Sequence, residues 1–94
     1  MANVPSLELL NATHTFPCLY VFKAIGLTNQ NFPARLIASV RDELQLSVDP
    51  PYSSRQTPDA KHVAITLELR VESAEKIVAI YHRILSVQGL VMVL

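Results

Sequence analysis

The side chains that most often carry chemistry are few in this chain and lie far apart in its sequence. Cys18 is the only cysteine, so no internal disulfide can form, and no histidine or cationic neighbour is apparent that would activate its thiol. We expect Cys18 to be a buried strand residue. His14, His62 and His82 lack the spacing that would hold a zinc ion. The sequence therefore predicts no catalytic residue, no metal site and no cofactor.

A polar run that precedes a helical pattern is the first candidate site for a ligand. Its side chains could form hydrogen bonds with the carboxylate or amide of a small effector, aided by the free N–H groups of the helix start. The same residue types also cap helices without any ligand, and glycine serves in turns. Both interpretations stay open for these residues: Gly26, Thr28, Asn29, Gln30 and Asn31.

Composition indicates one globular domain that spans residues 1–94, with residues 1–15 as an N-terminal extension. Half of the residues are hydrophobic and 17% are charged, with a formal net charge of zero. A nucleic-acid-binding protein normally carries a basic surplus, so we expect no nucleic-acid partner. The N-terminus resembles no signal peptide, and no apolar run approaches the roughly 20 residues that span a membrane. We expect a cytoplasmic protein without a membrane partner.

The elements that position these residues begin with the segment 62–71, where apolar and more polar side chains alternate strictly. This period of two predicts a strand with one buried face. Residues 18–25 are almost entirely apolar, which favours a central strand. We place Tyr20, Phe22 and Ala24 inside and Lys23 outside, and expect Gly26 to end the strand. Residues 52–57 predict an edge strand at most, and residues 90–94 predict a short final strand.

Two segments show the three- and four-residue spacing of amphipathic helices. The first spans about residues 32–46, with Pro33 in its first turn. The second follows Ser73, which we expect to be its cap. Its predicted buried stripe consists of Ile77, Ile80, Tyr81, Ile84 and Leu85. Residues 5–10 predict a short helical turn with Ser6 as its cap and Leu7, Leu9 and Leu10 as apolar contacts.

The order β-α-β-β-α-β predicts an α+β fold, the ferredoxin-like two-layer sandwich. Right-handed crossovers place both helices on one face of a four-stranded antiparallel sheet with strand order 4-1-3-2. The opposite face is then open. We expect a cross-strand ion pair between Lys23 and Glu68 there.

The open face is the second candidate site, because its side chains are apolar for a surface exposed to water. Its central members are expected to be Val21, Lys23, Ile25, Thr66, Val91 and Val93. Three occupants fit the sequence: a second copy of the chain, another protein, or the chain's own N-terminal segment with Leu7, Leu9 and Leu10.

The segment FPCLYVFKAIG, from Phe16 to Gly26, resembles the opening of the YbeD-like proteins, a bacterial family of small cytoplasmic proteins of unknown function. Further agreement lies in Val63 to Thr66, in Tyr81 and in the closing Met92-Val93-Leu94. The resemblance implies a fold similar to ACT-type regulatory domains, in which the loop after the first strand helps to bind effectors. It also implies a link to lipoate metabolism, and it implies no catalytic residue.

Two other functions occur on this topology, and the sequence supports them poorly. An acylphosphatase-like hydrolase needs a phosphate-binding loop after the first strand with a nearby arginine, and this loop has one glycine and no basic residue. An RNA-binding domain needs exposed aromatic residues on both central strands, and the strand 62–71 has none. The sequence thus favours a non-enzymatic regulatory or interaction module.

Overall fold

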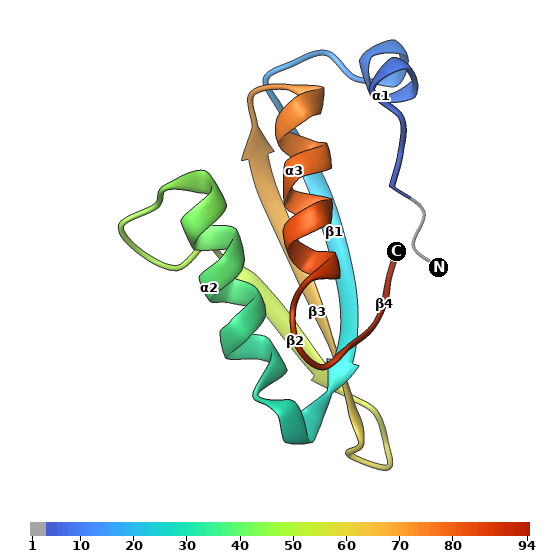
Figure 1. The fold of residues 1–94 in the computed structure, drawn as a ribbon, viewed down its shortest axis with the longest axis vertical. Coiled ribbons are helices and arrows are strands. Elements are labelled where there is room, and N and C mark those ends of the chain that lie inside the picture. The colour runs from blue at the N-terminus through green and yellow to red at the C-terminus, as the bar shows by residue number, and fades with distance from the viewer. Residues whose placement is uncertain (1–3) are drawn as a thin grey trace.

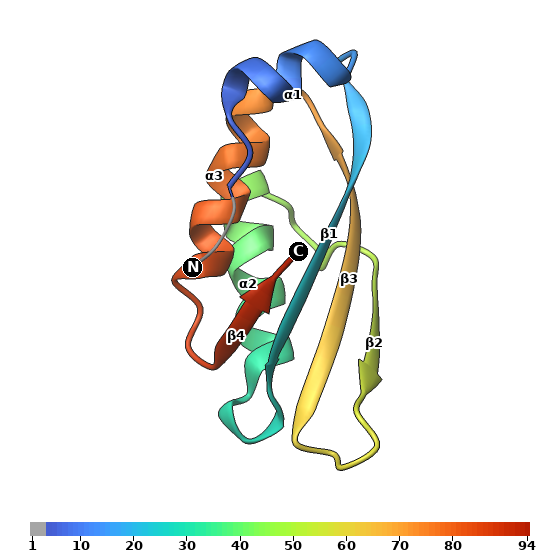
Figure 2. The same ribbon diagram turned by 90° about the vertical axis from the view of Figure 1, so that its right-hand side faces the viewer.

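The computed structural model describes residues 4–94, which form a four-stranded antiparallel sheet with two long helices on one of its faces (Figures 1 and 2). The strand order is β2-β3-β1-β4, so the predicted ferredoxin-like α+β fold is confirmed. In chain order the elements are α1 (Leu7–Thr13), β1 (Cys18–Leu27), a 3₁₀ turn η1 (Thr28–Gln30), α2 (Phe32–Leu44), β2 (Tyr52–Gln56), β3 (His62–Val71), α3 (Ala74–Leu85) and β4 (Leu90–Val93). No helix among the described residues is long and apolar enough to cross a membrane.

The core lies between the sheet and the helices, as the strand alternation predicts. In β3 every odd-numbered residue from Val63 to Val71 is buried, while the even-numbered residues point to the other face. Phe22 and Ala24 of β1 are buried on the same side. From the helices, the fully buried side chains include Leu36, Val40, Ile77, Ile80 and Ile84.

The helix ends follow local hydrogen bonds more than apolar spacing. The hydroxyl of Ser73 accepts from the N–H of Lys76 at 3.2 Å, which confirms the predicted cap. The prediction that the first long helix reaches residue 46 is wrong, because α2 ends at Leu44. Gln45 follows in the left-handed conformation, with φ of 54°. Leu85, predicted to be buried, is exposed at the last turn of α3, and Val87 is buried in the core just beyond the helix.

Gly26 does not end the first strand, contrary to the prediction, but lies inside β1 and is buried. A methyl group at this position would overlap the ring of Phe32. Phe32 is the first residue of α2 and is fully buried. The glycine is therefore required by the close approach of an aromatic ring to the strand rather than by a turn.

The N-terminal extension packs on the helix side of the sheet through α1, which contacts α3 (Figure 2). The hydroxyl of Ser6 accepts from the N–H of Leu9 at 3.1 Å, so the predicted cap is confirmed. Leu10 is buried in the core, whereas Leu7 and Leu9 are exposed. The helix thus packs against α3 and leaves two apolar side chains exposed on its own surface.

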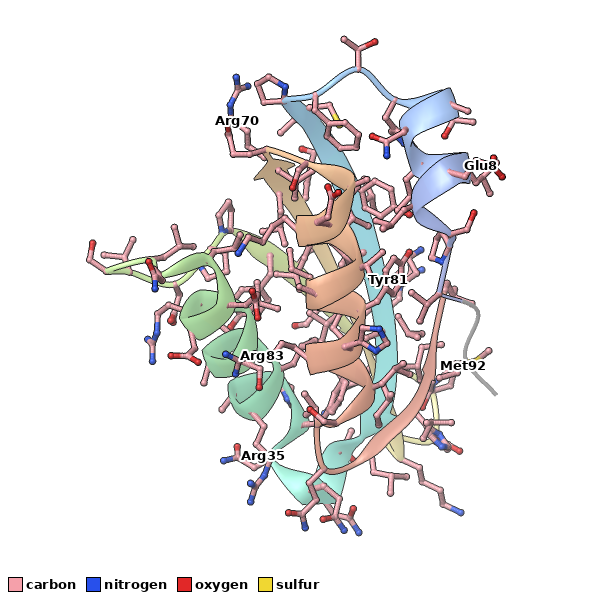
Figure 3. All side chains as sticks on the ribbon, turned by 45° about the horizontal axis from the view of Figure 1, so that its top comes forward. Glu8, Arg35, Arg70, Tyr81, Arg83 and Met92 are labelled. Carbon is pink, nitrogen blue, oxygen red and sulfur yellow. The ribbon has the colours of Figure 1, made fainter. Side chains whose placement is uncertain are left out.

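An aromatic cluster joins β1 to α3 beneath this N-terminal helix. The Tyr20 and Tyr81 hydroxyls are 3.0 Å apart, and the Tyr81 ring lies edge-on to Phe22 with centroids 5.0 Å apart. The Tyr81 hydroxyl also donates to the carbonyl oxygen of Leu94 at 3.4 Å. Figure 3 shows Tyr81 reaching from α3 toward β1. Burial, followed by the hydrogen bond with Tyr20, raises the pKa of Tyr81 well above its usual value.

Candidate binding surface

The polar loop after β1 uses part of its hydrogen-bonding capacity within the fold. The Thr28 hydroxyl donates to the carbonyl oxygen of Ala60 at 2.7 Å, and the Thr28 N–H donates to that of Lys61 at 3.1 Å. The side-chain oxygen of Gln30 accepts from Gln88 at 3.2 Å. These contacts connect the loop to the turn between β2 and β3 and to the segment before β4.

The other two polar side chains of this loop, Asn29 and Asn31, are exposed. Asn31 precedes α2 in the left-handed conformation with φ of 54°, and its side chain makes no capping hydrogen bond. The capping interpretation is therefore wrong for Asn31. This residue instead adopts the left-handed backbone conformation that the turn before α2 requires, which asparagine tolerates better than most residues. Binding of an effector by Gly26, Thr28, Asn29, Gln30 and Asn31 stays a prediction.

The open face of the sheet is bare within the described chain, because α2, α3 and α1 all lie on the other side (Figure 2). The interpretation in which the N-terminal segment covers this face is wrong, since Leu10 packs into the core on the helix side. Strand pairing sets Val21 opposite Glu68, Lys23 opposite Thr66 and Ile25 opposite Ala64. Val21, Lys23, Ile25 and Thr66 thus share one face, as predicted.

The short strand β4 departs from the predicted alternation through a bulge. Met92 lies opposite Ile25, but Leu90 lies opposite Gly26, so Val91 is an extra residue in the strand. Val93 lies opposite the buried Ala24 and packs against the core, so its predicted place on the open face is wrong. Met92 takes that place and is 46% exposed, and Val91 is exposed as well. Sequence alternation alone could not show the bulge.

The open face carries an apolar stripe along β1 and β4, interrupted by Lys23, and further charged side chains on β2 and β3. Leu19, Val21, Ile25 and Met92 follow β1 and β4, with Leu19 60% exposed and Val21 52% exposed. The strands β2 and β3 contribute most of the polar groups. The charged side chains of the open face are Lys23, Arg55, Glu68 and Arg70. Three positive charges stand against one negative charge, a surplus of two on a chain whose net charge is zero.

The predicted ion pair between Lys23 and Glu68 is absent from the described residues. Pairing places Lys23 opposite Thr66 rather than opposite Glu68, and the salt bridges of residues 4–94 all lie elsewhere. A shallow hollow of about 350 Å³ opens on this face beside Glu68, lined also by Val21, Tyr52 and Thr66. The ionic groups of the face are thus available to a partner.

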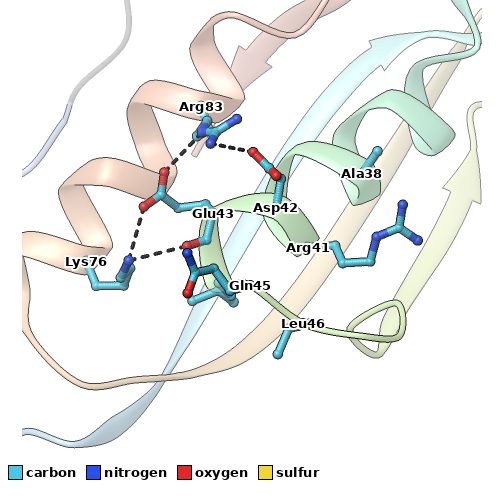
Figure 4. Close-up of a pocket in the computed structure, with 9 residues that line it drawn as sticks. Ala38, Arg41, Asp42, Glu43, Gln45, Leu46, Lys76 and Arg83 are labelled. Carbon is cyan, nitrogen blue, oxygen red and sulfur yellow. Dashed lines mark hydrogen bonds and ion pairs between the residues drawn. The ribbon is translucent and has the colours of Figure 1, made fainter.

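A second hollow, of about 680 Å³, lies between the C-terminal half of α2 and α3 (Figure 4). Glu43 accepts from Lys76 at 3.1 Å and from Arg83 at 3.0 Å, and Arg83 also reaches Asp42 at 2.6 Å. The hydrogen bond from Lys76, followed by that from Arg83, holds the pKa of Glu43 below its usual value. Sequence analysis missed this network, whose partners lie more than 30 residues apart.

These mutually paired charges hold α2 on α3, so we assign the second hollow a structural role. Nor do the described residues gather a group of three or more His, Cys, Asp or Glu side chains that could hold a metal ion. Cys18 is half-buried in β1, and the ring of His14 contacts that of Tyr20 at a tilt of 49°, with centroids 5.4 Å apart. The open face therefore remains the candidate surface, since it combines exposed apolar side chains with charged groups that form no ion pair within residues 4–94.

Residues 11–94 match a protein family described as "Protein of unknown function (DUF493)". The chain belongs to the DUF493 family. This confirms the resemblance to the YbeD-like proteins that is visible in the sequence. A comparison with curated proteins found no match.

The fold of this DUF493 protein also occurs in a solved structure. The solution structure of protein HP0495 from H. pylori matches with a TM-score of 0.67 and 18% sequence identity, covering 87% of this chain and 86% of that one. At this identity the likeness concerns the fold alone. The DUF493 assignment carries no specific role, so any function must be argued from the surface itself.

Proposed function

We propose that this DUF493 chain is a non-catalytic binding module whose open sheet face binds a partner protein with an apolar centre and acidic residues around it. The observation that carries the proposal is the combination of exposed apolar side chains with a positive surplus. Leu19, Val21 and Met92 supply the apolar stripe, and Lys23 and Arg70 supply cations without partners in the described chain.

Charge supports a different protein on this face rather than a second copy placed face to face. Two copies in that arrangement would bring six cations and two anions between the sheets, and like charges in a contact reduce affinity. An acidic partner would instead gain from each of the cations. Apolar patches of this kind on monomers frequently mark protein contacts.

A narrower form of the proposal follows from the resemblance to ACT-type domains, in which binding serves regulation. In that form the chain is a cytoplasmic regulatory protein, with a small effector at the loop 26–31 and a partner in lipoate metabolism. The exposed Asn29 and Asn31 are the loop side chains left to meet such an effector. No observation of the described residues favours the acylphosphatase-like alternative.

The experiment places a photo-reactive amino acid on the open face and, as a control, on the helix layer. Thr66 lies at the centre of the open face, opposite Lys23, and Ala34 is an exposed residue of α2. Each variant is irradiated in the protein's own host cells. Cross-linked products are identified by mass spectrometry, and the cross-linked site on the partner is mapped.

The expected result is a product with one other protein from Thr66 but not from Ala34, joined at a site with acidic residues nearby. A Lys23→Glu variant is expected to lose that product, whereas a Lys61→Glu variant, altered in the turn before β3, is expected to keep it. The absence of a product from Thr66, products with this chain alone, or a product unaffected by Lys23→Glu would contradict the proposal.

A further inference from the structure

The open face of the sheet presents side chains to a partner, whereas the backbone groups of its strands point elsewhere. In a sheet the N–H and C=O groups of each strand point sideways to the neighbouring strands, and side chains project from the two faces. A segment that lies on this face must therefore satisfy its own backbone hydrogen bonds. A helix does so internally except at its ends, but an extended segment needs a neighbouring strand to do so.

The apolar stripe of the open face has the length of a short helix. Leu19 and Ile25 lie near its two ends on β1, six residues apart, with Val21 between them and Met92 beside Ile25. Leu19 and Val21 are more than half exposed. At ~3.3 Å per residue the separation of the two ends is about 20 Å. A helix rises ~1.5 Å per residue, so ~13 residues, or about four turns, cover the stripe.

Two hollows beside the apolar stripe match the spacing of side chains on a helix. The first, of about 350 Å³, is lined on β3 by Thr66 and Glu68, and the second, of about 400 Å³, is lined on β3 by Ala64. The hollows are therefore about three residues apart along β3, roughly 10 Å. Helix residues that are seven positions apart project from the same side, roughly 11 Å from each other. Two such side chains of one helix fit both hollows.

The cations of the open face lie where such a helix carries its polar side chains. An amphipathic helix has polar residues directly beside its apolar stripe. On this face Arg55 and Arg70 lie on β2 and β3, and Lys23 interrupts the stripe of β1. None of the three forms an ion pair within residues 4–94. Acidic residues at the border of the helix's apolar stripe would therefore meet complementary charges.

We propose that the partner element on the open face is an amphipathic helix of about four turns, with acidic residues along the border of its apolar stripe, lying along β1 and β3. This inference rests on the proposed function and adds which part of the partner is bound. The sheet then lies between two helical layers, with α2 and α3 on one side (Figure 2) and the partner's helix on the other. The helix α1 of a second copy is too short for this role, since its seven residues span roughly 11 Å.

The experiment measures how far apart, in the partner's sequence, the residues lie that contact the two ends of the apolar stripe. An aliphatic diazirine amino acid replaces Leu19 in one variant and Ile25 in another, which keeps the size and apolar character of each side chain. A third variant carries it at Leu85, an exposed residue of α3, as the matched control on the helix layer. Each variant is irradiated in the host cells, and the cross-linked residue of the partner is identified by mass spectrometry.

The expected result is that Leu19 and Ile25 cross-link to one segment of one partner, at residues ~13 positions apart. Acidic residues are expected between the two sites, and no product with that partner is expected from Leu85. An extended segment over the same distance would place the sites only ~6 positions apart. A separation of that size, or two sites on different segments of the partner, would overturn the inference.

Failure of this inference and failure of the proposed function give different results. If Thr66 yields no product with another protein, the proposed function is contradicted and the helix is refuted with it. If Thr66 yields such a product but Leu19 and Ile25 yield none with the same partner, or yield sites at the spacing of an extended segment, the helix alone is refuted. Binding at the open face then stands.

Discussion

Gly26→Ala is expected to destabilise the fold, because the added methyl group would overlap the fully buried ring of Phe32. Overpacking of a well-packed core costs roughly 1–3 kcal/mol. The overlap involves three ring carbons, which places the cost toward the upper end of that range. A smaller gain opposes it, since alanine restricts the unfolded chain more than glycine does, by about 0.5 kcal/mol. The expected net loss is about 2 kcal/mol.

Chemical denaturation monitored by circular dichroism measures this loss directly. For a domain of this size it corresponds to a fall in Tm of roughly 8–16 °C. The cause is tested by a double-mutant cycle with Phe32→Leu, which removes the ring that the methyl group meets. We expect Gly26→Ala to cost about 1–2 kcal/mol less in the Phe32→Leu background than in the wild type.

Gly89→Ala is the matched control, because Gly89 is the other glycine of the sequence. There the added carbon would lie 2.7 Å from Gln30 Cβ and at an ordinary 3.7 Å from Phe32 Cβ, on a backbone with φ of 94°. It should also be destabilising, but its cost should not change with Phe32→Leu. Additive effects of Gly26→Ala and Phe32→Leu, within about 0.5 kcal/mol, would refute the role assigned to the ring.

Two further predictions concern groups with shifted pKa values. Glu43→Gln should lower stability by about 1 kcal/mol at pH 7, as expected for a partly exposed network. Because the folded-state pKa of Glu43 is lowered, its contribution is present above the unfolded value of 4.5 and is lost as pH falls through the folded value. The difference between wild type and variant should vanish near pH 2 in urea titrations, and a constant difference would contradict the assignment. Tyr81→Phe removes a phenol whose pKa is raised by burial and by Tyr20. Ultraviolet titration of the wild type should show one tyrosine that resists ionisation well above pH 10, and the variant should lack it. A late tyrosine that persists in Tyr81→Phe would contradict that assignment.

The sequence predicts the fold well because its strongest patterns are local. The alternation in residues 62–71 determines which face of β3 is buried, and Ser73 determines where α3 begins. The features that it missed depend on pairing between distant segments. The bulge in β4 turns Val93 inward and Met92 outward, and no single-strand pattern encodes that change.

The candidate surface shows the same division between local and distant information. Val21, Lys23, Ile25 and Thr66 share a face because the alternation in β1 and β3 holds in the structure. The supposed pairing of Lys23 with Glu68 required the register between the two strands, which the sequence does not contain. The side of the sheet on which α1 packs depends on where Leu10 can be buried, and that is decided by the assembled helix layer.

The cross-linking yield from Thr66 in cells, compared with that from Ala34, tests most directly whether the open sheet face is the binding surface. The account predicts a product with another protein from Thr66 that disappears in Lys23→Glu, and no such product from Ala34. Equal products from both positions, or a product that survives charge reversal at Lys23, would contradict it.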